Sequence, residues 1–266
     1  MWTAASEAFE KGTGKGWVIS LQYYGESHVG LRRKNNQDSF CILENGHHAI
    51  LAVVCDGIGG GNAGDIASHM CVEHMKERFI TAEAFENDQV VKKWLHEVVQ
   101  EANDLVFTSS ANHIEYKGMG TTVVGVLQVI DRTYIFNAGD SRTYGLYQDD
   151  FICLTEDHSY VADLLKRGEV SEEEASHHPN RNMLTNALGI WNTMRLDIHK
   201  IKEDYQSLLI CSDGLHGYVE ETRIQEVLKR KEGVQQNVHQ LIQMSLDAGG
   251  FDNVTVIVLK RGDLNE

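Results

Sequence analysis

The chain has 266 residues, 42% of them hydrophobic, and its 24 basic and 39 acidic side chains give a formal net charge of −15. This composition argues against nucleic acid or an anionic membrane as a partner, and no apolar run approaches the roughly 20 residues that a membrane span needs. With neither a signal-peptide pattern nor a C-x-x-C pair, the sequence predicts a monomeric cytoplasmic protein with a single domain over residues 1–266.

The first predicted elements are three strands. Residues 17–24 have the apolar character of a strand, and a second strand follows a polar loop and ends at the Asn-Gly hairpin signal at 45–46. Residues 48–55 form the return strand, which runs directly into Asp56 and a glycine-rich turn. We therefore expect Asp38 and Asp56 to lie on neighbouring strands.

Two helices are predicted next. Apolar residues at helical spacing indicate one buried face over residues 63–80. A second, longer helix is expected to begin at a cap formed by Asn87 or Asp88, with an apolar stripe that ends at Leu105. Trp94 belongs to the same periodic pattern and is expected to be a core residue.

The second half of the chain returns to strand patterns. Strands are predicted over residues 119–130, 132–140 and 141–154, and residues 155–190 break the pattern as a long, charged excursion that resembles a flap. The remaining predicted elements are strands at 194–201 and 205–214, helices at 224–231 and 234–246, and a last strand after Asp252.

Five aspartates share one context, since each stands at an end of a strand-like run: Asp38, Asp56, Asp140, Asp213 and Asp252. Oxygen ligands without clustered cysteine or histidine suit Mg²⁺ or Mn²⁺ better than structural zinc. Carboxylates that converge without a cation repel one another, and a pair of divalent ions would remove that cost and activate a water molecule. An aspartate at a strand end is more often a turn or cap residue, so the spacing alone leaves both interpretations open.

Two further features concern ligand binding. The guanidinium of Arg33 is suited to a phosphate, because it can bind two oxygens at once. The glycines Gly59, Gly61 and Gly64 match a dinucleotide-binding fingerprint between a strand and a helix. That fold needs another parallel strand ending in an acid about 20 residues later, whereas two helix patterns follow here, so we discount the match.

Six short segments occur in the order that a known enzyme family has them. They are R-K-N-N-Q-D (33–38), V-V-C-D-G-I-G-G-G (53–61), G-T-T (120–122), N-A-G-D-S-R (137–142), C-S-D-G-L (211–215) and D-N-V-T (252–255). The ordered set resembles the motifs of bacterial-type, metal-dependent serine/threonine protein phosphatases of type 2C, the PPM family, over about residues 17–260. The resemblance implies an α+β fold, a four-layer αββα sandwich of two antiparallel sheets flanked by helices, with a flap near residues 155–190.

The resemblance also implies a set of metal ligands. Asp56 would bridge two ions of Mg²⁺ or Mn²⁺, and the carbonyl group of Gly57 would bind one of them. Asp213 and Asp252 would complete the ligand set of the other ion. Asp140 would take part in a third, weaker metal site near the flap.

Further roles follow from the same resemblance. Asp38 would bind metal through water, and Arg33 would bind the substrate phosphate. Ile58 and Gly61 stand where relatives place histidines, Ile58 at the position of a candidate acid, so the resemblance leaves the general acid unassigned. Gln37 replaces an acidic residue of many relatives.

The implied activity is hydrolysis of phosphoserine and phosphothreonine in proteins, by direct attack of a water that bridges the two ions. The partner is then a phosphorylated protein, and the enzyme opposes a serine/threonine kinase. The alternative is a catalytically silent regulatory or binding module of the same fold. The complete carboxylate set together with Arg33 favours the enzyme, because two-metal hydrolysis needs these groups.

Overall fold

The computed structural model describes residues 2–6, 21–59, 63–148 and 150–262, and residues 2–6 are described by their backbone alone. The start of the predicted strand over residues 17–24, the position of Gly61 and the two ends of the 1–266 domain lie outside the described residues. The strand itself runs further than expected, to His28.

The described strands form two antiparallel sheets. The first has the order β1-β2-β12-β11-β8-β9, with β1 (Trp2–Ser6), β2 (Leu21–His28), β12 (Val254–Arg261), β11 (Ser207–Cys211), β8 (Arg142–Tyr147) and β9 (Asp150–Cys153). The second has the order β10-β7-β6-β4-β3, with β10 (Asp197–Lys200), β7 (Arg132–Ala138), β6 (Val123–Val129), β4 (Ile50–Ile58) and β3 (Asp38–Glu44), and β5 (Gly120–Thr121) pairs with β4.

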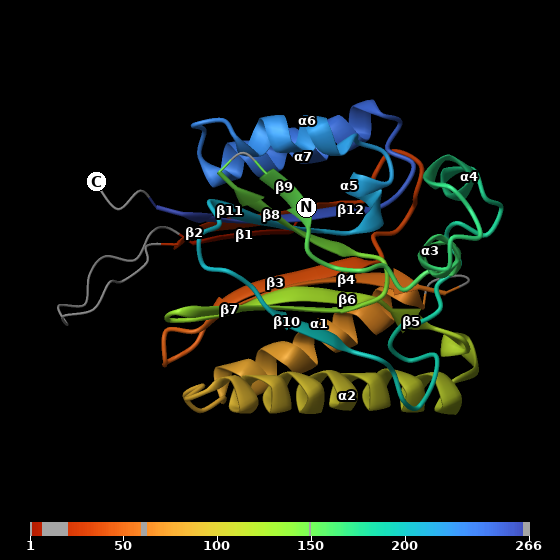
Figure 1. Cartoon of the computed structure of the whole chain (residues 1–266). Coiled ribbons are helices and arrows are strands. Elements are labelled where there is room, and N and C mark those ends of the chain that lie inside the picture. The colour runs from red at the N-terminus through yellow and green to blue at the C-terminus, as the bar shows by residue number, and fades with distance from the viewer. Residues whose placement is uncertain (1, 7–20, 60–62, 149, 263–266) are drawn as a thin grey trace.

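Helices cover the outer face of each sheet, as Figure 1 shows. On the second sheet lie α1 (Gly64–Ile80) and α2 (Asp88–Asn112), and on the first lie α6 (Glu221–Leu228) and α7 (Val234–Asp247). The short elements are η1 (Ile114–Tyr116), α3 (Tyr160–Lys166), α4 (Glu172–Ser176) and α5 (Asp213–His216), and α3 and α4 belong to the predicted flap. The expected four-layer αββα sandwich is confirmed. No helix in the described part of the chain combines the length and apolar character of a membrane span.

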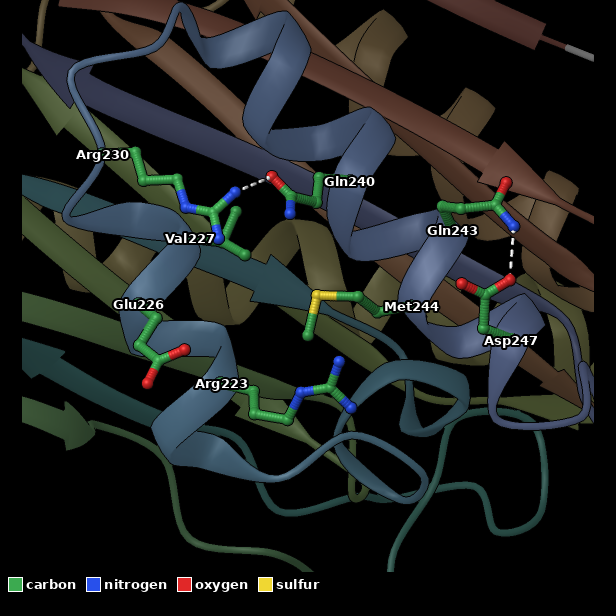
Figure 2. A pocket seen from close by; sticks show the side chains of 8 residues that line it. All are labelled: Arg223, Glu226, Val227, Arg230, Gln240, Gln243, Met244 and Asp247. Atoms are coloured by element: carbon green, nitrogen blue, oxygen red, sulfur yellow. Dashed lines mark hydrogen bonds between the residues drawn. The ribbon is translucent and has the colours of Figure 1, made fainter.

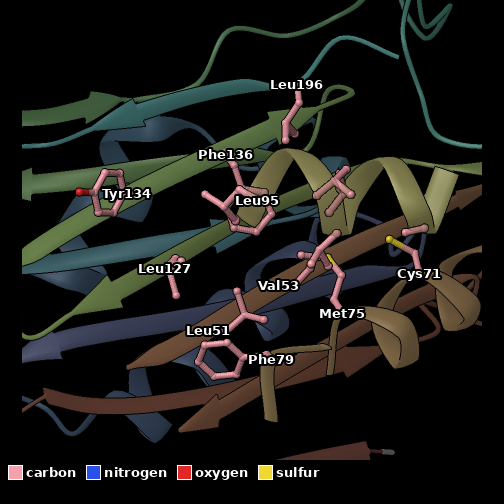
Figure 3. Close-up of a cluster of buried hydrophobic side chains, with 14 of the residues drawn as sticks. Leu51, Val53, Cys71, Met75, Phe79, Leu95, Leu127, Tyr134, Phe136 and Leu196 are labelled. Atoms are coloured by element: carbon pink, nitrogen blue, oxygen red, sulfur yellow. The ribbon is translucent and has the colours of Figure 1, made fainter. Parts of the chain in front are cut away.

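The alternation of β4 shows how the layers are held together. Leu51 and Val53 face α1 and α2, where they pack with side chains such as Phe79 (Figure 3). Ala52 and Val54 point the other way, into an apolar layer between the two sheets. Because successive side chains of a strand alternate, one continuous apolar run supplies two different cores.

Several predicted elements differ in detail. Residues 141–154 are a hairpin of β8 and β9 rather than one strand, because the backbone turns back at Gln148, which has φ 44°. No Asn-Gly signal marks this turn in the sequence. Leu105 is exposed, and Val106 is the buried residue that packs in its place. A period of 3.6 allowed either residue, and the contact with α1 decides between them. Trp94 is partly buried, edge-on to Phe79.

The hairpin between β3 and β4 and the cap of α2 are both as predicted. Asn45 organises the hairpin loop, since its side-chain oxygen accepts from the backbone N–H groups of His47 and Ala49. His48, rather than the glycine, takes the positive φ of 57°. The side chain of Asn87 accepts from two backbone N–H groups in the first turn of α2.

Gly125→Ala is expected to destabilise the protein. A Cβ at this position of β6 would lie 2.4 Å from the Phe136 ring and 2.6 Å from the carbonyl oxygen of Ala52. Overpacking of this kind costs about 1–3 kcal/mol of unfolding free energy. Urea unfolding measures the change, and Gly46→Ala is the matched control because a Cβ there meets nothing within 4 Å. Equal midpoints for the two variants would contradict this account of β6 packing.

Candidate active site

Strand alternation delivers the first two aspartates to one place. Asp56 continues the face of β4 that carries Ala52 and Val54, so its side chain points into the space between the sheets. Asp38 begins β3 and lies directly opposite Asp56 in the antiparallel register. The expectation that the two carboxylates lie on neighbouring strands is confirmed.

The other three aspartates arrive from both sheets. Asp213 follows β11, Asp252 precedes β12, and these strands are neighbours in the first sheet. Asp140 follows β7 of the second sheet. Burial raises the pKa of Asp56 well above its usual value, and the charges of the other four aspartates raise it further. The structure therefore brings the other four carboxyl groups within electrostatic reach of Asp56.

The backbone of Asp56 is held by the Gly-Thr-Thr segment. Thr122 donates its N–H to the Asp56 carbonyl oxygen at 2.8 Å, and its hydroxyl accepts the Asp56 N–H at 2.9 Å. The hydroxyl of Thr121 donates to the same carbonyl oxygen at 3.0 Å. These bonds leave the Asp56 side chain as the group presented to the site.

Asp38 is fixed by two hydroxyl groups that the sequence analysis did not single out. Ser212 and Thr255 donate to its Oδ2 at 2.8 and 2.7 Å. Thr255 lies on the inward face of β12, two residues from Ile257 of the inter-sheet core, and Ser212 follows β11, two residues from Ile210, so alternation was the signal that could have found them. Oδ1 of Asp38 is buried and has no hydrogen-bond partner among the described residues.

Gly57 lies where no side chain fits. A Cβ there would be 2.0 Å from the carbonyl oxygen of Gly64 and 2.6 Å from that of Gln37, to which the Gly57 N–H donates at 3.0 Å. The end of β4, the start of α1 and the loop before β3 thus meet backbone to backbone. Gln37, noted as a departure from the family pattern, sits in this contact.

Asn253 ties the polar loop before β3 to the start of β12. Its Oδ1 accepts the N–H of Gln37 at 2.8 Å, and its Nδ2 donates to the carbonyl oxygens of Val29 and Asn35. The loop carries Arg33, whose guanidinium donates to Oδ2 of Asp252 at 2.7 Å while the side chain stays 48% exposed. Arg33 therefore lies at the edge of the carboxylate cluster and within reach of a ligand.

Burial and mutual repulsion dominate the electrostatics of the cluster. Burial raises the pKa values of Asp38, Asp140 and Asp213, against two hydroxyl bonds at Asp38. The charge of Asp213 raises the values of Asp38 and Asp140, and that of Asp252 raises the value of Asp213. A bound cation would relieve this repulsion.

The donor set fits hard divalent ions. Buried Oδ1 atoms of Asp38 and Asp213 lack partners among the described residues. In that same part of the chain, no three acidic, histidine or cysteine side chains are already arranged around one point as a ligand cage. Mg²⁺ does not require such a cage, because it keeps several waters and takes only one or two carboxylates. A backbone carbonyl such as that of Gly57 would complete a set of this kind.

Asp140 is connected to the flap and to α5. His216 donates from Nε2 to the Asp140 carbonyl oxygen at 3.1 Å, and burial lowers the pKa of this ring to about 3, so it is neutral at pH 7. Beside Asp140, the backbone N–H of the buried His158 donates to the Gly139 carbonyl oxygen, and its ring contacts Asp197 through Nε2 at 3.1 Å. The sequence analysis assigned neither histidine a role, and both anchor backbone next to the carboxylates.

The hollow between α6 and α7 is separate from this cluster. Figure 2 shows Arg223, Glu226 and Met244 around a cavity of about 240 Å³, and Arg230 donates to Gln240 across it. None of the predicted site residues lines it. The candidate active site is therefore the carboxylate cluster between the sheets.

Comparisons with known proteins agree with this geometry. The family model for protein phosphatase 2C matches residues 24–250. A serine/threonine phosphatase, Stp, of Listeria monocytogenes serotype 4b is 36% identical over 233 residues, which cover 87% of this chain and 92% of Stp.

Solved structures give the same result. The serine/threonine phosphatase Stp1 of Staphylococcus aureus superimposes with a TM-score of 0.85 at 32% identity, covering 96% of this chain and all of Stp1. The catalytic domain of the serine/threonine protein phosphatase PstP, solved with two manganese ions, superimposes with a TM-score of 0.80 at 28% identity, over 93% of this chain and all of that domain. These matches favour the enzyme over a catalytically silent module. The chain belongs to the protein phosphatase 2C family and is a serine/threonine protein phosphatase of the bacterial type.

Proposed function

We propose that the carboxylate cluster holds two Mg²⁺ or Mn²⁺ ions and that Asp140 contributes to a third site beside the flap. Asp56 would hold both ions, the Gly57 carbonyl would bind one of them, and Asp213 and Asp252 would bind the other. The observation that carries this proposal is the mutual repulsion among these carboxyl groups, which Arg33 at the edge and Arg142 near Asp140 offset only in part. The two manganese ions in the PstP catalytic domain support the number of ions.

The residues of the chain then divide the work of hydrolysis. Bound ions supply a water of lowered pKa and neutralise phosphate oxygens. Asp38, with Oδ2 held by Ser212 and Thr255, presents Oδ1 to orient water in the site. The two nearby hydroxyls, of Ser212 and Thr255, are fully buried, so neither is placed to attack a substrate phosphate, and water would attack phosphorus directly. Arg33 binds phosphate oxygens from the rim.

We further propose a phosphorylated protein as the substrate, with phosphoserine or phosphothreonine supplied by an opposing serine/threonine kinase. The enzyme acts as a cytoplasmic monomer with one phosphatase domain over residues 1–266. Its formal charge of −15 supports the exclusion of nucleic acid and anionic membranes as partners.

Turnover and metal content test the metal roles together. The purified protein is expected to hydrolyse a phosphothreonine peptide with Mn²⁺ and to lose this activity with EDTA. Calorimetric titration of the EDTA-treated protein with Mn²⁺ is expected to give at least two binding sites per chain, because two-metal hydrolysis needs two ions. Full activity in EDTA, or a single site, would contradict the proposed ligand set.

Arg33→Ala is expected to raise KM for a phosphopeptide about tenfold or more, with kcat changed much less, because a charge-assisted hydrogen bond to the phosphate is lost. Steady-state kinetics at saturating Mn²⁺ measure both constants. Arg230→Ala is the control, since it removes the same charge from the α6–α7 hollow. Unchanged KM and kcat in Arg33→Ala would remove Arg33 from the mechanism.

A further inference from the structure

Two loops run side by side at the rim of the carboxylate cluster. The backbone N–H groups of Leu31 and Arg32 both donate to the carbonyl oxygen of Gly250, at 2.7 and 3.1 Å. One residue further along each loop, Arg32 lies over the ring of Phe251, with 5.8 Å between the guanidinium carbon and the ring centroid. The pairing ends at the contact between Arg33 and Asp252 already described, so the paired loops lead directly to a proposed metal ligand.

Large apolar side chains are exposed along this rim. Leu31 is 63% exposed, Phe251 is 49% exposed, and Tyr218, just after α5, is 39% exposed. The rings of Tyr218 and Phe251 stack with centroids 5.6 Å apart. Leu31, Arg32, Tyr218 and Phe251 form what we call the mouth patch. A contiguous exposed apolar patch of this kind marks an interaction surface more often than isolated apolar residues do.

The Phe251 ring is held in place by its own loop. Gly249 has φ 127°, and a Cβ there would lie 2.2 Å from the ring, so the ring rests against the glycine. The Phe251 ring also contacts the Tyr218 ring and the Arg32 guanidinium. The aromatic surface is therefore arranged before any ligand binds. Preorganisation of this kind lowers the entropic cost of binding.

Basic side chains gather at the mouth patch, although the whole protein is acidic and the charges of Asp213 and Asp252 also act on Tyr218. Arg32, Arg33 and Lys34 are consecutive exposed basic residues in a chain with net charge −15. Arg181, from the flap, also acts electrostatically on Tyr218. Basic residues beside an apolar surface are complementary to an anionic peptide. A symmetric contact between two copies of the chain through this patch would place the same basic residues against each other, which is unfavourable.

The mouth patch lies beside the carboxylate cluster, where the residue next to a phosphorylated serine or threonine of a bound peptide would lie. Phe251 is next to Asp252 in sequence, and the charges of Asp213 and Asp252 raise the pKa of Tyr218. Adjacent residues of an extended peptide are separated by about 3.3–3.6 Å, and their side chains reach several ångströms further. A side chain beside the phosphorylated residue can therefore reach the mouth patch while the phosphate lies at Arg33.

We propose that the mouth patch binds a bulky apolar side chain adjacent to the phosphorylated serine or threonine, so that the enzyme selects phosphopeptides with such a neighbour. This inference rests on the proposed active site. Leu31, Tyr218 and Phe251 supply the apolar contact, and Arg32 supplies charge to the same peptide.

Two phosphothreonine peptides that differ only in their flanking residues test the proposal, one with leucine on both sides and one with glycine. The wild-type enzyme with Mn²⁺ is expected to prefer the leucine peptide about tenfold in kcat/KM, which equals about 1.4 kcal/mol, the order expected from partial burial of a leucine side chain. In the double variant Tyr218→Ser/Phe251→Ser the preference is expected to fall toward one, with kcat/KM for the glycine peptide unchanged. Phe251→Leu is expected to keep most of the preference.

The control is Ile114→Ser, which removes an exposed apolar side chain from η1, outside the mouth patch. A wild-type enzyme that hydrolyses both peptides equally would overturn the inference and leave the proposed function intact. A wild-type enzyme with no Mn²⁺-dependent turnover of the glycine peptide would overturn the proposed function instead.

Two other results would also overturn the inference. An equal loss for both peptides in the double variant would mean that the patch only supports Asp252. An unchanged preference, together with a lower molar mass of the double variant by light scattering, would mean that the patch is an interface between copies of the chain.

Discussion

Asp56→Asn is expected to abolish Mn²⁺-dependent turnover, with a fall in kcat of at least about 10³-fold, equal to about 4 kcal/mol of transition-state stabilisation. The reason is that the proposed bridging ligand loses its charge while its shape is kept. The backbone bonds from Thr121 and Thr122 to Asp56 do not involve the side chain, so the strand is expected to stay in place.

The same variant is expected to fold at least as stably as the wild type when metal is removed. An amide has no charge to bury or repel, whereas burial and four neighbouring aspartates oppose the charge of Asp56. Phosphopeptide turnover and thermal unfolding in EDTA measure the two effects. Asp131→Asn is the matched control, because Asp131 is exposed in the turn between β6 and β7. Retained turnover in Asp56→Asn would exclude Asp56 as the bridging ligand.

The metal-free protein is expected to lose stability as the pH rises from 6.5 to 8. Folding raises the pKa of Asp38 to about 7 and that of Asp140 to about 8, mainly by burial. The folded chain therefore holds protons that the unfolded chain has released above a pKa of about 3.9. The stabilising contribution is complete below that value and is lost as the pH rises through the folded-state values.

This pH window separates the aspartates from other groups. His216 and His158 have lowered pKa values in the folded protein, and their contribution increases with pH only up to the unfolded value of about 6.5. Buried cysteines such as Cys211 have raised pKa values, and their contribution is lost only above the unfolded value of about 8.5. Between these limits the expected fall comes from the carboxylate cluster.

Thermal unfolding in EDTA measures the effect. A difference of about one bound proton between the folded and the unfolded chain corresponds to a fall in Tm of about 4 °C or more over the window. Excess Mn²⁺ is expected to raise Tm at every pH in the window, and to raise it more at pH 8, because the ligands must be deprotonated to bind metal. A flat Tm in EDTA together with no response to Mn²⁺ would contradict a repelling cluster that binds metal.

The anchoring of Asp140 gives the flap a direct connection to the chemistry. Arg142 binds Asp157 through two hydrogen bonds of 2.8 Å, and His158 holds the carbonyl group of Gly139. These contacts join the first residues of the flap to Gly139 and Arg142, which lie on either side of Asp140 between β7 and β8. The proposed third metal site therefore lies where the flap meets the sandwich, and the flap begins from a fixed point.

The sequence by itself determined the local elements and the family. Period-two and continuous apolar runs identified β4 and β12, the Asn-Gly signal identified the first hairpin, and Asn87 marked the start of α2. Each of these depends on backbone propensity or side-chain alternation within about ten residues, which a sequence displays directly. The ordered motifs then identified the family and with it the layered fold.

Only the tertiary structure decided which distant residues meet. The hydroxyls of Ser212 and Thr255 reach Asp38, and Leu31 lies beside Gly250, because β12 pairs with both β2 and β11. Strand order and register arise from the packing of two sheets across a shared core, and no local pattern encodes them. For the same reason the hairpin of β8 and β9 was missed, since its turn lacks a glycine and its pairing completes the edge of a sheet that only the folded chain assembles.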